Sequence, residues 1–317
     1  MLASLERRTY LPDLQEYFLV KFLTSNHYIW QVLPVSLIIV AEILIFTGHM
    51  EAATTVHAVT LILLVLIAMY NDNRIYPILL LLPLFRLLNV AMPVFFTVSL
   101  YSYPLVYAPM FLPIYLILKD GILSRSEAGI TFRGFWFYLP LAVAVGFALG
   151  WGEYNVLQPG MLLPSVNVEN VLILTIIMIL FVGVVEEFVF RSALQTVLET
   201  RMGSAAGLLA ASFIFGFMHS GYHLPQELIY VSFAGAVFGL LFWMSKSLPV
   251  IAVAHGVTNI SLFLVAPLNS WALVYLIGVP GLLFVLYAYV FKKMPRKIKP
   301  AEKSKLKIEE NVVDIKS

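Results

Sequence analysis

Long runs of apolar residues, separated by short polar segments, occupy most of the chain. A membrane barrel would instead show segments of about ten residues with alternating apolar and polar positions. A helix needs roughly 20 apolar residues to cross a bilayer, and several runs approach that length. The pattern therefore predicts an all-α, polytopic helical membrane protein with about 8–10 transmembrane helices. The ten apolar stretches are residues 30–48, 54–70, 76–97, 101–118, 135–151, 169–187, 205–220, 228–244, 248–266 and 271–291.

The composition agrees with a membrane protein and excludes other classes. Hydrophobic residues make up 61% of the 317 residues and charged residues 12%, against about 45–50% and 25% in soluble domains. The net charge is only +2. These values exclude a disordered chain, an ordinary soluble enzyme and a nucleic-acid binder with a strong basic field. Cysteine is absent, so a disulfide framework, a thiolate zinc site and a cysteine nucleophile are excluded as well.

The basic residues are distributed on one side of the predicted membrane. If the N-terminus lies in the cytoplasm and the loops alternate, 18 of the 20 Lys and Arg residues fall in cytoplasmic segments. Cytoplasmic segments of membrane proteins carry such an excess of positive charge. We therefore expect both termini in the cytoplasm (N-in and C-in), with an even number of crossings. Residues 1–28 read as an uncleaved interfacial or cytoplasmic lead-in.

One long polar loop divides the predicted helices into two blocks. It runs from Lys119 to Phe135 on the predicted cytoplasmic side. We expect residues 1–134 to form an N-terminal membrane block of about four helices whose function is unknown, called the front block below. Residues 135–291 form a second membrane domain, the back block, and residues 292–317 a basic cytoplasmic tail.

Ionisable residues inside apolar stretches are informative, because a charge near the bilayer centre costs at least about 2.5–3.5 kcal/mol. Glu186 and Glu187 follow sixteen mostly apolar residues, and Arg191 lies one helical turn after Glu187. Glu186 points about 100° away from Glu187. One carboxylate can therefore pair with the guanidinium while the other stays free. A purely structural salt bridge is the alternative.

Two further segments of the back block place polar side chains in apolar stretches. An antiparallel hairpin that turns near Gly203 would bring Glu186 and His219 to one level. His255 and Asn259 share one face of a later helix. Each group also has a purely structural alternative. His219 could cap its helix, and His255 and Asn259 could form hydrogen bonds between helices.

The front block contains a comparable set of polar residues. Glu42 and Arg86, with Asn89 one turn later, lie inside apolar stretches. Arg86 either pairs with Glu42 across two helices or binds an anionic group.

The ordered motifs of the back block resemble those of the CPBP family, the CAAX proteases and bacteriocin-processing enzymes. Its best-known branch is the type II CAAX prenyl endopeptidase. The shared motifs are Glu-Glu-x-x-x-Arg at residues 186–191, Phe-x-x-x-His at 215–219 and His-x-x-x-Asn at 255–259. The resemblance covers roughly residues 135–290 and does not account for the front block.

The resemblance implies an intramembrane endopeptidase of the glutamate type. Glu186 and His219 would hold and activate a water molecule. His255 and Asn259 would polarise the scissile carbonyl group and stabilise its oxyanion. An apolar environment makes a carboxylate a usable general base near neutral pH. No cofactor is implied.

The resemblance also implies supporting residues and leaves one alternative mechanism. Glu187 and Arg191 would form a supporting ion pair. Glu186, His219 and His255 could instead bind zinc through a His₂Glu set with an open position, although the sequence contains no His-Glu-x-x-His motif. We place this zinc mechanism second to the metal-free one.

The partners expected from the resemblance are the lipid bilayer and a membrane-associated protein or peptide substrate, with a prenylated CAAX protein as one option. The protein would reside in the plasma membrane or an endomembrane, with its active site in the cytoplasmic half. A C-terminal sorting-tail peptidase, a non-catalytic immunity or scaffold protein and a transporter remain alternatives, although no inverted repeat typical of transporters is evident.

Overall fold

The protein is an all-α, multi-pass membrane protein, as the apolar pattern predicts. The computed structural model describes residues 27–95 and 99–268, and every regular element in these ranges is helical. Eight described helices are long and apolar enough to cross a membrane, and Val32–Phe46 is a shorter apolar helix. Nine of the ten predicted stretches are helical. The tenth, residues 271–291, lies outside the described residues, as do most of the lead-in and the whole tail.

The front block consists of a helical hairpin and two interrupted helices. Prolines interrupt the last of these, because proline lacks the N–H group that a continuous helix requires. Pro104 is the second residue of a short helix, and Pro109 lies in the 3-10 turn that follows it. The elements are α2 (His27–Phe46), α3 (Met50–Tyr70), α4 (Ile75–Leu79), α5 (Leu81–Phe95), η1 (Leu100–Ser102), α6 (Tyr103–Tyr107), η2 (Ala108–Met110) and α7 (Phe111–Lys119).

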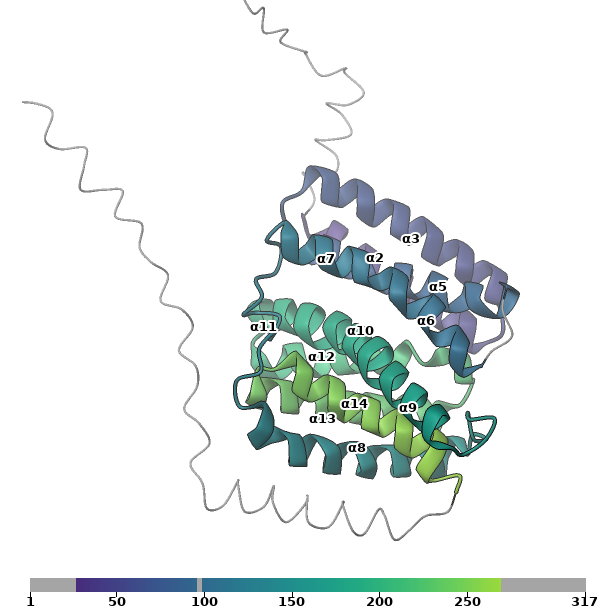
Figure 1. Ribbon diagram of the computed structural model, residues 1–317. Coiled ribbons are helices and arrows are strands. Elements are labelled where there is room, and N and C mark those ends of the chain that lie inside the picture. Colours follow the sequence, from purple (N-terminus) through teal and green to yellow (C-terminus); the bar gives the residue numbers. More distant parts are fainter. Residues whose placement is uncertain (1–26, 96–98, 269–317) are drawn as a thin grey trace, which may run out of the picture.

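The back block is built around one 35-residue helix, Val168–Met202. In Figure 1 the front helices lie on one side of this long helix, and α8, α13 and α14 lie on the other. The elements are α8 (Phe135–Leu157), α9 (Val168–Ile176), η3 (Ile177–Gly183), α10 (Val184–Glu187), η4 (Phe188–Gln195), α11 (Thr196–Met202), α12 (Ser204–Phe217), η5 (Ser220–Tyr222), α13 (Pro225–Ser245), α14 (Leu248–Ile260) and η6 (Ser261–Val265).

The predicted hairpin turn lies where the sequence places it. The long helix ends at Met202, and α12 begins at Ser204. Gly203 between them has a φ of +86°, a conformation that glycine adopts without the steric penalty of a Cβ atom. Because α12 runs back along the end of the long helix, His219 and Glu186 line one cavity, which is described below.

Glycines allow α14 to pack closely between α8 and η3. A Cβ atom on Gly150 of α8 would lie 2.1 Å from the carbonyl oxygen of Thr258, and one on Gly183 of η3 would lie 2.5 Å from that of Ala252. Small residues at such positions let membrane helices approach until their backbones touch. The close approach fixes the position of α14, which carries His255.

The loops predicted to be cytoplasmic are joined to one another at one end of the bundle. Arg74 donates a 2.8 Å hydrogen bond to Glu127, and Lys246 lies 3.8 Å from Glu199. Partial burial tends to raise the pKa of Glu127, but hydrogen bonds from Arg74 and Ser124 outweigh this effect and lower the pKa. These contacts agree with the common side that the charge pattern gives these loops. The cytoplasmic orientation of that side stays a prediction.

The Gly150→Ala substitution is expected to destabilise the protein, because the added methyl group would overlap the Thr258 carbonyl oxygen. Overpacking of this kind typically costs about 1–3 kcal/mol. Thermal unfolding of the detergent-solubilised protein measures the effect. Gly160→Ala is the matched control, since a Cβ atom there has no neighbour within 4 Å. Equal melting temperatures for the two variants would contradict the close packing of α14.

Candidate active site

A cavity of about 430 Å³ lies between the front and back blocks. All four predicted catalytic side chains line it, namely Glu186, His219, His255 and Asn259. They come from the long helix, the turn after α12, and α14, so the fold brings together the three motifs that the sequence separates. The front-block part of the wall consists of Phe85, Arg86, Asn89, Met92, Tyr103, Val106 and Tyr107.

Glu186 lies in a short α-helical turn between two π-helical segments of the long helix. Wider π turns change the direction of the side chains that follow and are frequent at functional sites. The Tyr107 hydroxyl group donates a 2.5 Å hydrogen bond to Oε1 of Glu186. Oε2 lies 3.7 Å from Nε2 of His255. The carboxylate is therefore buried at the cavity wall between a phenol and an imidazole.

Glu187 and Arg191 form the predicted ion pair, with Nη1 of Arg191 3.0 Å from Oε1 of Glu187. Arg191 also donates a 3.2 Å hydrogen bond to the carbonyl oxygen of Gly235. Its guanidinium lies 4.0 Å from the ring centroid of Phe215, within the range of a cation–π interaction. Both charged side chains are buried, so Arg191 joins the long helix to α12 and α13.

His255 is oriented by the same carboxylate. Its Nδ1 lies 2.6 Å from Oε1 of Glu187, and its ring stacks on Phe238 with a centroid distance of 5.2 Å. A carboxylate only accepts hydrogen bonds, so Nδ1 carries the hydrogen when Glu187 is ionised. Nε2 is then the nitrogen directed at Glu186.

His219 lies in the turn after α12 and is oriented by the backbone of that helix. Nδ1 lies 2.9 Å from the carbonyl oxygen of Phe215, one turn earlier on α12. A carbonyl oxygen cannot donate, so Nδ1 holds the hydrogen and Nε2 of the neutral ring is free to accept one. The ring also stacks on Tyr222, which follows in η5. This arrangement suits a side chain that accepts a proton or holds a water molecule.

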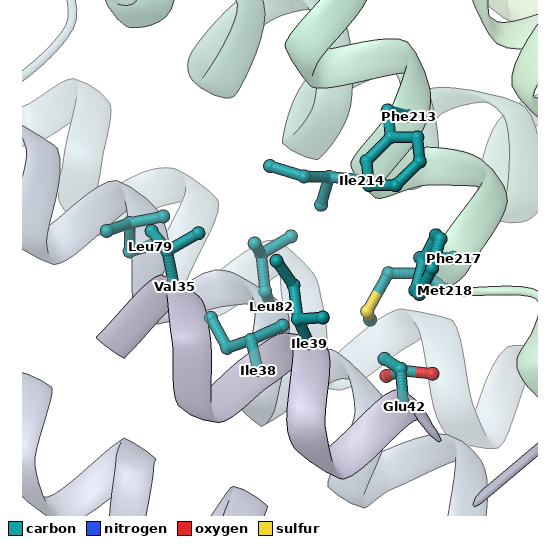
Figure 2. A pocket seen from close by; sticks show the side chains of 10 residues that line it. All are labelled: Val35, Ile38, Ile39, Glu42, Leu79, Leu82, Phe213, Ile214, Phe217 and Met218. Carbon is teal, nitrogen blue, oxygen red and sulfur yellow. The ribbon is translucent and has the colours of Figure 1, made fainter. Parts of the chain in front are cut away.

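A second buried ion pair, in the front block, supports the chain around His219. Glu42 pairs with Arg86, as one of the two sequence interpretations predicts, at distances of 2.8 and 2.6 Å. Ser220 donates a 2.5 Å hydrogen bond to the same carboxylate, and Arg86 donates to the carbonyl oxygen of Met218. Figure 2 shows Glu42 near Met218, beside a narrow gap of about 10 Å³ between α2 and α12. The residues on either side of His219 are thus held by the front block.

Tyr107 and Glu153 are among the cavity residues that were not expected from the sequence. Tyr107 gives no signal, because tyrosine is common in this chain and its partner is remote in sequence. Glu153 of α8 is buried and lines the cavity. The predicted apolar stretch ends at Trp151, whereas α8 continues to Leu157. The sequence boundary of this helix was therefore wrong by about one and a half turns, because polar residues after Trp151 still pack inside the bundle.

The alternative zinc site requires three donor side chains that converge on one point. Across residues 27–95 and 99–268, no group of three or more His, Asp or Glu side chains is arranged to hold a metal ion. The short contacts of Glu186 and His255 are made with protein groups, as described above.

The comparison with protein families agrees with the motifs. Residues 168–261 match the family model described as type II CAAX prenyl endopeptidase Rce1-like. This segment is similar to that family, and it is shorter than the range of residues 135–290 over which the motifs resemble the family. It includes all six residues of the predicted site, which confirms the family resemblance. No curated protein and no solved structure matches the chain.

The Rce1-like match supports a coarse function for the protein. The family consists of CAAX-type proteases that act on membrane-associated substrates, so the match supports peptidase activity in a membrane-embedded protein. The matched segment begins at residue 168. The front-block wall of the cavity therefore lies outside it.

The Arg191→Met substitution is expected to destabilise the protein strongly, because it leaves the Glu187 carboxylate buried without its cation. Breaking one partner of a buried pair typically costs about 3–5 kcal/mol. The double variant Glu187→Gln/Arg191→Met removes both charges and should regain much of the loss. Chemical unfolding in detergent measures the two single variants and the double variant. Additive effects of the two substitutions would contradict the pairing.

Proposed function

We propose that the protein is a glutamate-type intramembrane endopeptidase that hydrolyses a peptide bond near the C-terminus of a membrane-associated substrate. The observation that carries the proposal is the convergence of Glu186, His219, His255 and Asn259 on one cavity. All four lie within the Rce1-like segment.

Glu186 and His219 supply two acceptors for one water molecule. In the proposed step, the Glu186 carboxylate takes a proton from the water while the water oxygen attacks the scissile carbonyl carbon. Nε2 of His219 accepts a hydrogen bond from the second O–H group of the water, which stays intact. This bond directs a lone pair of the water oxygen at the substrate. The proton held by Glu186 then passes to the leaving amine as the carbon–nitrogen bond breaks. Neither side chain is consumed, so the site is ready for a new water molecule.

His255 and Asn259 supply hydrogen-bond donors for the oxyanion of the tetrahedral intermediate. The Asn259 amide is a neutral donor on the same helix face as His255. For His255 this role requires hydrogens on both ring nitrogens, since Glu187 binds Nδ1. Removing one preorganised donor of this kind commonly lowers the rate about 10²–10³-fold. Glu187 and Arg191 act by holding His255 in place.

The mixed character of the cavity wall supports a substrate with an apolar anchor and a peptide end. Phe85, Met92 and Val106 give apolar surface opposite the polar groups. We place the site in the cytoplasmic half of a cellular membrane on the basis of the charge pattern. A farnesylated peptide with a C-terminal CAAX sequence is the first probe to use, because the match is to a prenyl endopeptidase family.

Glu186→Gln and His219→Ala are each expected to lower cleavage of the farnesylated peptide by at least about 10²-fold, since each removes one ligand of the attacking water. The assay is release of the C-terminal peptide by full-length protein in liposomes, followed by mass spectrometry. Both variants should still fold and insert into the membrane, which a control for the amount of protein in the liposomes checks.

The matched controls remove the same groups at exposed positions. Glu51 and His49 lie at the start of α3, and both are exposed. The Glu51→Gln and His49→Ala variants should cleave the peptide at the wild-type rate. Wild-type cleavage by Glu186→Gln and His219→Ala would refute the proposed mechanism.

Chelator inhibition together with one zinc ion per purified protein would favour the zinc mechanism instead. No cleavage of any membrane peptide would favour a non-catalytic member.

A further inference from the structure

Tyr107 is a front-block residue in direct contact with the proposed general base. Its hydroxyl group donates to Oε1 of Glu186 at 2.5 Å, across 79 positions of sequence. Both side chains are buried. A hydrogen bond to an ionised acceptor at this distance is among the strong ones. The contact therefore joins the two blocks across the wall of the cavity.

The local sequence fixes where this hydroxyl group points. Tyr107 ends the five-residue helix α6, which begins next to Pro104 and is followed by Pro109. Its ring meets Phe85 edge-on at 5.3 Å and stacks on Tyr103 at 6.2 Å between centroids. A ring packed on two sides has little freedom to turn away. The hydroxyl group is thus presented to the long helix in one position.

We propose that Tyr107 is a positioning residue that gives the two oxygens of Glu186 different tasks. Oε1 is occupied by the phenol, whereas Oε2 faces Nε2 of His255 at 3.7 Å. Oε2 is then the oxygen that accepts the proton from water. The front block thereby contributes a residue to the active site. The positioning role of Tyr107 rests on the proposed peptidase function.

The contacts of the front block near His219 agree with this assignment. Arg86 binds the carbonyl oxygen of Met218, and Glu42 accepts a hydrogen bond from Ser220. These are the residues directly before and after His219. Both side chains that are proposed to activate water are therefore held from the front block, although the Rce1-like match begins at residue 168.

The Tyr107→Phe substitution tests the positioning role, because it removes only the hydroxyl group. With the farnesylated peptide and full-length protein in liposomes, kcat should fall about 10- to 100-fold, as for a lost hydrogen bond to a charged group. KM should stay within about twofold, since the ring remains. Tyr115→Phe is the matched control. It removes the same atom from α7 of the same interrupted helix, where the side chain is 58% exposed, and should keep the wild-type kcat.

A stability cycle tests the contact without relying on activity. Tyr107→Phe, Glu186→Gln and the double variant are unfolded in detergent, and the effect of Tyr107→Phe is compared in the two backgrounds. The inference expects a lower melting temperature with Glu186 present and a clearly smaller change in the Glu186→Gln background. Equal changes in both backgrounds, or a wild-type kcat for Tyr107→Phe, would overturn it. If the wild-type protein cleaves no peptide, the proposed function fails, and the cycle still decides whether Tyr107 holds Glu186.

Discussion

Glu187 is the group on which the buried polar contacts of the back block converge. A charge in an apolar interior is stable only when it is paired and hydrogen-bonded. One carboxylate oxygen of Glu187 meets both Arg191 and His255. Arg191 in turn reaches the backbone of α13, and His255 lies on α14. The position of the imidazole at the cavity follows from this one buried carboxylate and from the glycine contacts that bring α14 close.

The pairing of Glu187 leaves its neighbour available. Glu186 points to another side of the helix, and its closest contact is with a hydroxyl group, not with a guanidinium. It therefore faces the cavity beside His219 and His255. A second buried pair, Glu42 with Arg86, lies in the front block. It binds the backbone of Met218 and the side chain of Ser220, and so it holds the segment that carries His219. The proposed reactive groups thus lie between two ion pairs that stabilise the helices around them.

Much of this arrangement could be predicted from the sequence, because the membrane makes its constraints visible there. The apolar runs indicate the helices, and the spacing of Glu187 and Arg191 predicts their pair. Contacts between remote segments were harder to predict. The contact of Tyr107 with Glu186 depends on where a helix interrupted by prolines is placed in space. Glu153 was missed because polar residues after Trp151 obscure the true end of α8, and the π-helical turns around Glu186 leave no clear trace in the apolar period.

The most direct test of a membrane-embedded peptidase built on Glu186 is a comparison of protein C-termini in cells. Cells that express the wild-type protein or Glu186→Gln at equal levels are compared by mass spectrometry of C-terminal peptides from the membrane fraction. The account predicts that one or a few membrane-associated proteins lose a short C-terminal segment only in cells with the wild-type protein. Identical C-termini in the two samples, with both proteins folded and in the membrane, would contradict it.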